Sequence, residues 1–289
     1  MKHYRKYTTA LILSILFISC SSDDIIVIDD TIEISQEIKD LIYFKGDEDA
    51  PIVIINAQSG PDTELSTGEV EEIFQIFDTT NLLAVNVHQA QTLNPGLVEG
   101  DDITFDQAIN FSAQSVETFY KVVKYFKDQG RTVHVLGISF GAFIAQDLIA
   151  KKGIDVADSY LIMAGRLDMN DIMWQAFSEG RFGYFENGIT PIIDQEIGSD
   201  VIDRNLDRLA AGVSNNRYTE RLNSYEDLSK ITYVYGEIDQ AVGKLTTTEI
   251  EFLQSKNVNI IAGPGNHDET INDFIVQGFD EAFGIQLKN

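Results

Sequence analysis

The stretch RTVHVLGISFGAFIAQDLIA, residues 131–150, decides the fold of this chain. It opens with an apolar run at residues 133–138 and turns sharply in the sequence GISFG. It continues with apolar side chains at helical spacing, among them Ile144, Leu148 and Ile149. The pattern predicts a strand, a tight turn with a central serine, and a helix.

The central serine of that turn, Ser139, has the setting of a nucleophile. A serine on such a turn adopts a strained backbone conformation that lifts its oxygen clear of the sheet edge. The strand and the helix come so close that Gly137 and Gly141 are needed beside it. The helix N-terminus below favours negative charge at this point. The alternative is a glycine-rich turn whose serine has no role.

The chain around this unit alternates between apolar strands and amphipathic helices. Buried strands are expected at 51–55, 82–87, 159–164, 231–235 and 258–262, and helices at 105–129 and 273–283. Capping boxes at Ser66/Glu69 and Thr246/Glu249 predict two further helix starts. Segments 31–38 and 40–45 alternate like early strands. The expected fold class is α/β, with a mostly parallel sheet and helices on both faces.

A neutral serine needs a base, usually histidine, that an acid orients. Of the four histidines, His3 lies in the N-terminal leader and His134 lies in the serine's own strand, roughly 16 Å along the chain from Ser139. His267 follows the last strand in GPGNHD and is the expected base. His88, at the end of another strand, stays open as a base or as a wall of the site.

The acid is expected at the carboxyl end of another strand, because parallel sheets gather their sites at that edge. Asp239 meets this condition in GEIDQAV, directly after residues 231–235. Asp168, Glu237 and Asp268 are the alternatives. Asp268 adjoins His267 in sequence, which usually directs its side chain elsewhere.

The order Ser139, Asp239, His267, each after a strand, resembles the α/β-hydrolase superfamily over residues 40–289. GEIDQAV is similar to the family's G-x-x-D-x-x-V at the acid. The resemblance implies a roughly eight-stranded sheet, and a helical cap insertion at about 165–230, where the strand–helix rhythm breaks. It also implies an oxyanion hole from the backbone N–H groups of Phe140 and Gln58, although Asn56-Ala57 replaces the family's His-Gly.

The expected activity is hydrolysis of an ester, amide or thioester through an acyl-enzyme, with no cofactor and no metal. A serine at the nucleophile position argues against dehalogenase and epoxide-hydrolase chemistry, because relatives for those reactions carry aspartate there. Cap aromatics such as Trp174 and Phe177, together with His88, could line an apolar substrate pocket, or the aromatics could form the cap's own core. The alternative function is a non-catalytic α/β-hydrolase-fold lipoprotein that binds a ligand or partner.

The N-terminus resembles a bacterial lipoprotein signal. A basic start precedes an apolar core at 11–18 that is too short to span a bilayer, and Cys20 follows. We expect a signal peptide at 1–19, lipidation of Cys20, a tether at 20–38 and the hydrolase domain at 39–289. An ordinary secretory signal is the alternative. The expected location is the cell envelope, at the outer membrane of a Gram-negative bacterium.

Cysteine content and charge limit the remaining functions. Cys20 is the only cysteine, so the chain forms no internal disulfide and has no catalytic thiol elsewhere. Loss of residues 1–19 leaves 18 basic against 46 acidic residues, a net charge of −28. Such a charge argues against nucleic acid as a partner. The expected partners are a small-molecule or acyl substrate and, through Cys20, the membrane; the oligomeric state is open.

Overall fold

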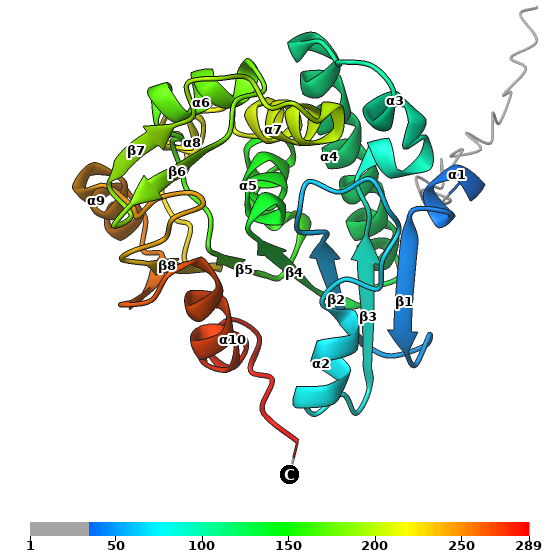
Figure 1. Cartoon of the computed structure of the whole chain (residues 1–289). Coiled ribbons are helices and arrows are strands. Elements are labelled where there is room, and N and C mark those ends of the chain that lie inside the picture. The colour runs from blue at the N-terminus through cyan, green and yellow to red at the C-terminus, as the bar shows by residue number, and fades with distance from the viewer. Residues whose placement is uncertain (1–34, 289) are drawn as a thin grey trace, which may run out of the picture. The chain divides into compact units, whose positions relative to one another are not determined.

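A computed structural model describes residues 35–288 (Figure 1). The predicted signal peptide, Cys20 and the tether up to residue 34 lie outside these residues. A strand was predicted at residues 31–38. The described part of this segment is instead the start of a short helix, α1 (Gln36–Lys39), which Ser35 caps. None of the described helices is both long and apolar enough to cross a membrane.

The centre of the domain is a mostly parallel sheet, as predicted. Within the described residues it has seven strands, in the order β1–β3–β2–β4–β5–β8–β9, close to the eight expected. Only β1 runs antiparallel, against β3. The strands are β1 (Ile42–Gly46), β2 (Ile52–Ala57), β3 (Leu82–Val87), β4 (Thr132–Ile138), β5 (Ser159–Met163), β8 (Ile231–Gly236) and β9 (Asn259–Gly263).

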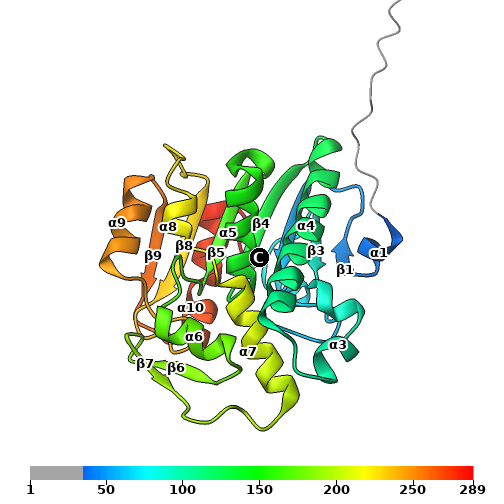
Figure 2. The same cartoon turned by 90° about the horizontal axis from the view of Figure 1, so that it is seen from above.

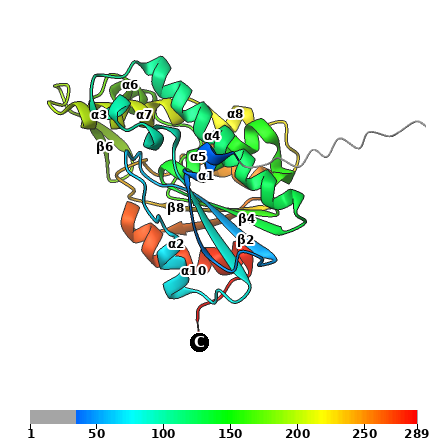
Figure 3. The same ribbon diagram turned by 90° about the vertical axis from the view of Figure 1, so that its right-hand side faces the viewer.

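Helices cover both faces of this sheet (Figures 2 and 3). The helices α4, α5 and α9 share one face and its core, and α2 and α10 share the other. The helices and short 3₁₀ turns outside the cap are α2 (Val70–Ile76), η1 (Ala90–Leu93), α3 (Gly96–Glu99), α4 (Phe105–Asp128), α5 (Phe140–Lys152), η2 (Ile154–Val156), α9 (Thr247–Ser255) and α10 (His267–Phe283).

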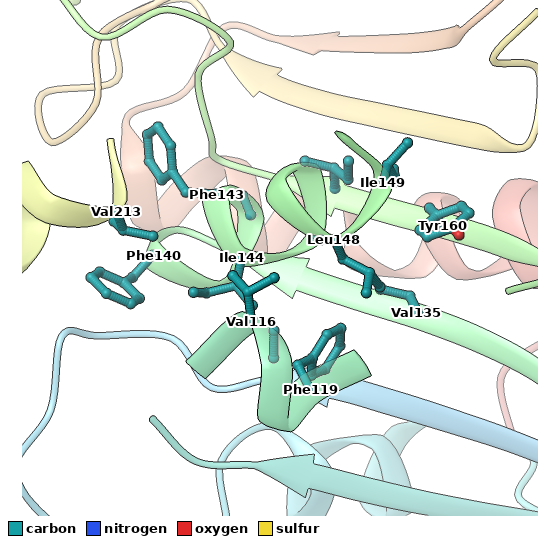
Figure 4. Close-up of a cluster of buried hydrophobic side chains, with 14 of the residues drawn as sticks. Val116, Phe119, Val135, Phe140, Phe143, Ile144, Leu148, Ile149, Tyr160 and Val213 are labelled. Atoms are coloured by element: carbon teal, nitrogen blue, oxygen red, sulfur yellow. The ribbon is translucent and has the colours of Figure 1, made fainter. Parts of the chain in front are cut away.

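The helix α5 lies at the centre of the larger core (Figure 4). Its residues 140–149 are all buried, so the helix is enclosed on every side, and its two polar residues there, Gln146 and Asp147, are buried too. Ile144 and Leu148 pack among Val116 and Phe119 of α4 and Val135 of β4. A helix enclosed on all sides is held rigidly, and the residue that precedes it, Ser139, is held with it.

Residues 165–230, the predicted cap, lie between β5 and β8. They contain α6 (Asp171–Ser178), β6 (Gly183–Glu186), β7 (Thr190–Ile193), α7 (Val201–Val213) and α8 (Tyr218–Arg221). The hairpin β6–β7 was not predicted. Its turn is Asn187-Gly188, with φ of 51° and 69°, and Asn-Gly between two short strands is a strong hairpin signal.

Two predicted helix starts had different outcomes. Thr246 and Glu249 form a capping box at the start of α9, as predicted. The box at Ser66 and Glu69 is absent, and α2 begins at Val70 without a side-chain cap. The reason is that Glu69 accepts hydrogen bonds from Ser59 and Asn56 instead.

Candidate active site

Ser139 occupies a strained turn between β4 and α5. Its φ and ψ are 54° and −116°, a conformation that residues with a Cβ rarely adopt. Two close approaches require the glycines around it. A Cβ on Gly137 would lie 2.6 Å from the Gly141 carbonyl oxygen, and a Cβ on Gly141 would collide with the Ala57 carbonyl oxygen. The local sequence therefore fixes this turn sterically.

The structure brings Ser139, His267 and Asp239 together from three different loops. His267 Nε2 lies 3.0 Å from Ser139 Oγ, and His267 Nδ1 lies 2.7 Å from Asp239 Oδ2. His267 is the first residue of α10, and its backbone N–H donates to Gln240 Oε1 at 3.2 Å. Both distances between the side chains lie within the range of a hydrogen-bonded nucleophile, base and acid.

The environment of Asp239 sets the direction of these hydrogen bonds. Asp239 is 1% exposed, and its Oδ1 accepts from the backbone N–H groups of Ala241 (2.8 Å) and Val242 (3.0 Å). A carboxylate can only accept, so Oδ2 accepts from the N–H at His267 Nδ1. His267 Nε2 then carries a lone pair and accepts from the Ser139 hydroxyl.

The other histidine and acid candidates lie in other environments. Asp168 accepts from the backbone and side chain of Thr219. Glu237 and Asp268 are exposed. His134 lies 2.8 Å from Ser159 Oγ and stacks on Phe283, at the amino half of β4.

His88 is held in a hydrogen-bond network and does not line the cavity at Ser139. Its Nδ1 lies 2.8 Å from the Leu41 carbonyl oxygen, and its Nε2 contacts the backbone of Ser66. It is 4% exposed. The expectation of a pocket wall is therefore corrected, because both ring nitrogens are engaged, one with the residue before β1 and one with the loop after β2.

The backbone N–H of Phe140, which directly follows the nucleophile, is the first N–H of α5. First-turn N–H groups have no intrahelical acceptor, and this one has no other partner among residues 35–288. Gln58 differs from the expectation. Its N–H donates to the Val87 carbonyl at 3.1 Å, and its side chain accepts from Asn86. It is thus not available as an oxyanion donor.

The next residue, Ser59, has a different environment from Gln58. It lines the same cavity as Ser139 and His267, and its N–H has no partner within the described chain. The loop is tied down by polar contacts: Ser59 Oγ donates to Glu69 at 2.6 Å, and Gln89 Nε2 donates to the carbonyls of Gln58 and Ser59 at 3.1 Å. No sequence motif identified these polar residues, because their pairing depends on contacts between distant loops.

Trp174 and Phe177 belong to the interior of the cap. Trp174 donates from Nε1 to the Ala211 carbonyl at 3.1 Å and meets Phe105 edge-on at 5.4 Å. Phe177 is 8% exposed and belongs to the α4–α5 core. Neither lines the cavity that contains Ser139. Of the two roles expected for them, a substrate pocket or the cap's own core, these contacts agree with the core.

A cavity of about 680 Å³ contains Ser139 and His267 and extends between α2 and α10. It lies on the opposite face of the sheet from α4 and α5. Among residues 35–288 no three His, Cys, Asp or Glu side chains are grouped so that they could hold a metal ion.

Solved structures of α/β hydrolases share the fold of this chain at low sequence identity. No protein-family model matches the sequence, and no curated protein matches it. The enzyme MGS-M2 from a Medee basin deep-sea metagenome library, an α/β hydrolase, is 13% identical with a TM-score of 0.54, over 86% of this chain and 95% of its own. A thermostable carboxyl esterase from Bacillus coagulans is 13% identical with a TM-score of 0.51, over 83% and 90%.

The peroxisomal α/β hydrolase Lpx1 of Saccharomyces cerevisiae is 9% identical with a TM-score of 0.51, over 84% of this chain and 79% of its own. Similarity at this level of identity concerns the fold. The sheet order, the helices on both faces and these structural neighbours agree, and the chain has the α/β-hydrolase fold.

Proposed function

We propose that this protein is a serine hydrolase that cleaves an ester, or a related amide or thioester, through an acyl-enzyme at Ser139. The observation that carries the proposal is the continuous chain of hydrogen bonds from Ser139 through His267 to the buried Asp239. A serine held in a strained conformation, with a base and an acid in contact, has the geometry of an activated nucleophile.

In the first half-reaction His267 Nε2 takes the Ser139 hydroxyl proton while Oγ bonds to the substrate carbonyl carbon. Asp239 holds the imidazole tautomer and stabilises the imidazolium. The carbon–oxygen bond to the leaving group then breaks, and His267 returns the proton to that oxygen. Water repeats the sequence on the acyl-enzyme, so that the acid is released and Ser139 regains its proton.

The oxyanion of both intermediates would be held by the backbone N–H groups of Phe140 and Ser59. The Phe140 N–H also lies at the N-terminus of α5, whose positive end favours developing negative charge. Each such donor lowers the barrier by roughly 3 kcal/mol. The choice of Ser59 rests on its free N–H and its place in the Ser139 cavity.

We also propose that the domain is carried on the cell envelope through a lipid at Cys20. The support is the sequence alone: a basic start, a short apolar core and a single cysteine before an acidic segment. Metabolic labelling with a fatty-acid analogue, compared with the Cys20→Ser variant, tests it. Equal labelling of both proteins would contradict it.

The experiment for the activity is rapid mixing of the purified protein with p-nitrophenyl acetate. We expect hydrolysis with an initial nitrophenol burst stoichiometric with enzyme, or a steady rate that Ser139→Ala abolishes. The Asp168→Asn variant is the matched control, because this acid also follows a strand but contacts Thr219 rather than His267. Hydrolysis that survives in Ser139→Ala would contradict the proposed nucleophile.

A further inference from the structure

The cavity at Ser139 is a groove with a mixed lining, polar near the reacting atoms and with an apolar set of side chains along its length. Its walls come from two helices on one face of the sheet, and its floor comes from the central strand that ends in the nucleophile. We call it the α2–α10 groove; its apolar lining is Ile73 and Ile76 of α2, Leu136 and Ile138 of β4, and Ile271 and Ile275 of α10.

The groove begins at the reacting atoms. Ser139 and His267 line it at the carboxyl edge of the sheet, where α2 and α10 both start. From there it follows the two helices back beneath β4. His267 to Ile275 spans eight residues of α10, and a helical rise of 1.5 Å per residue makes this about 12 Å.

The lining of the groove ends near the C-terminal end of α2. Phe77, which lines this end, stacks on Phe279 with ring centroids 4.2 Å apart. The C-terminal segment is attached to the same part of the chain: Lys288 N–H donates to the Ile76 carbonyl at 3.0 Å, and Asp78 N–H donates to the Gln286 carbonyl at 2.8 Å. The length of the groove is therefore taken from its lining residues on α10.

The charge near the reacting atoms is uniformly negative. Glu69, Glu72 and Asp268 line the groove, and none of the described residues that line it is Lys or Arg. An anionic substrate would meet uncompensated repulsion here, whereas a neutral or cationic substrate would not.

We propose that the α2–α10 groove binds an unbranched alkyl chain of about eight carbons, carried by a neutral or cationic ester whose carbonyl lies at Ser139. The assignment rests on the proposed hydrolase function. A carbon–carbon bond of about 1.5 Å advances an extended chain by about 1.3 Å, so roughly nine bonds fill 12 Å. The chain can belong to the acyl group or to the alcohol, and the two are separated by experiment.

On the cap side of the site, Phe140, Phe143 and Val213 belong to one continuous hydrophobic core (Figure 4). Other apolar side chains of the cap, such as Ile172 and Phe182, are exposed. None of them lines the cavity that contains the nucleophile, which is lined from the α2–α10 side.

The test is a chain-length series below the micelle concentration. One arm varies the acyl group of p-nitrophenyl esters from acetate to dodecanoate, and the other varies the alcohol from ethyl to octyl acetate. Burying one methylene group raises binding affinity about fourfold when it is fully enclosed, and about twofold in a half-open groove. Six added carbons should therefore raise kcat/KM roughly 50-fold in one of the two arms. Chains longer than the groove should add nothing further.

Two variants locate the effect. Ile76→Trp fills the far end of the groove from a position that is 37% exposed, and should cut the ratio of octanoate to acetate kcat/KM at least tenfold. Gln75→Trp places the same side chain one residue away, outside the groove lining, and should keep the preference. Ile275→Trp repeats the test from the opposite wall if the first variant folds poorly.

The charge of the substrate is tested with two octanoyl esters of similar size. Octanoylcholine should be hydrolysed at least tenfold faster than the octanoyl ester of glycolate, and added salt should narrow the difference. The groove assignment would be overturned by a flat chain-length profile in both arms, or by an octyl preference that Ile76→Trp and Ile275→Trp leave intact. In either case, hydrolysis of the acetate ester would still support the proposed hydrolase function. Absence of all ester hydrolysis would contradict the proposed function and this assignment with it.

Discussion

Replacing Asp239 by asparagine should leave the site assembled and remove its base. Asp239 Oδ1 accepts from two backbone N–H groups, of Ala241 and Val242, and only one oxygen of an asparagine can take that place. The amide NH₂ must then face His267 Nδ1. A donor at that position forces the proton of the imidazole to Nε2, which now donates to Ser139 and cannot accept its proton.

The size of the loss follows from the cost of escaping that arrangement. Turning the amide over would restore the correct tautomer but would leave two buried N–H groups facing an NH₂ group. Each unsatisfied group costs about 1–3 kcal/mol, about 2–6 kcal/mol together. We therefore expect kcat to fall by between about 10² and 10⁴, and the upper value is the loss known for a reversed tautomer in a Ser-His-Asp triad.

The assay is p-nitrophenyl ester hydrolysis beside thermal unfolding of the same samples. Asp239→Asn should melt near the wild type, because both loop hydrogen bonds persist, whereas Asp239→Ala should lose stability as well as activity. A kcat for Asp239→Asn within tenfold of the wild type, in a normally folded protein, would refute the role given to this carboxylate.

Three further outcomes are expected. Ser59→Pro deletes the proposed oxyanion donor and should lower kcat by about 10²–10³. Ser59→Ala keeps the backbone N–H, so its kcat should fall by less than tenfold. An equal fall in kcat for the two variants would exclude this N–H as a donor. Burial beside Asp203 and Asp194 raises the pKa of Asp207 to about 7, so the folded state is penalised increasingly as the pH rises from about 4 through 7. This pKa shift corresponds to a loss of stability of about 4 kcal/mol at high pH, which partial exposure of the carboxyl group reduces to about 1–2 kcal/mol. Asp207→Asn should therefore raise the free energy of unfolding at pH 8 but not at pH 4. Arg166 pairs with the buried Glu249 at 3.5 Å and donates to the Val242 carbonyl at 3.3 Å. Arg166→Met should therefore lower the free energy of unfolding in denaturant by about 3 kcal/mol, and should also lower kcat because the Asp239 loop loses this contact. An unchanged free energy of unfolding would show that the ion pair contributes nothing to stability.

The sequence predicted those features that depend on local chemistry. The glycines around Ser139 and the apolar runs of the strands each have a steric or periodic cause that a short window contains. The three loops that carry Ser139, Asp239 and His267 could be placed at one edge because parallel strands end there. The order of these residues along the chain then led to the fold.

Features that depend on contacts between distant segments were missed. Glu69 looked like a helix cap by its spacing, but Ser59 and Asn56 come from the neighbouring strand end and bind it. Gln58 occupied the expected oxyanion position, but its N–H extends the ladder to Val87. Spacing along the chain does not reveal such competing partners.

The sequence left the role of the cap aromatics open between a pocket and a core for a related reason. Large aromatic side chains such as Trp174 are equally suited to a ligand pocket and to a packed core, and composition cannot separate the two. The α2–α10 groove is lined instead by side chains that the sequence presented as ordinary helix and strand faces, among them Ile76 and Ile275. Ile76 is 37% exposed, whereas Leu136 and Ile138 of β4 are buried.

The central claim is that Ser139 is an activated nucleophile, and reaction with a fluorophosphonate probe tests it most directly. We expect the probe to form one covalent adduct, found by mass spectrometry on the peptide that contains Ser139. Ser139→Ala should abolish the adduct, and His267→Ala should slow its formation by at least 10³, because the serine then lacks its base. A folded wild-type protein that stays unlabelled, or labelling that persists in Ser139→Ala, would contradict the claim.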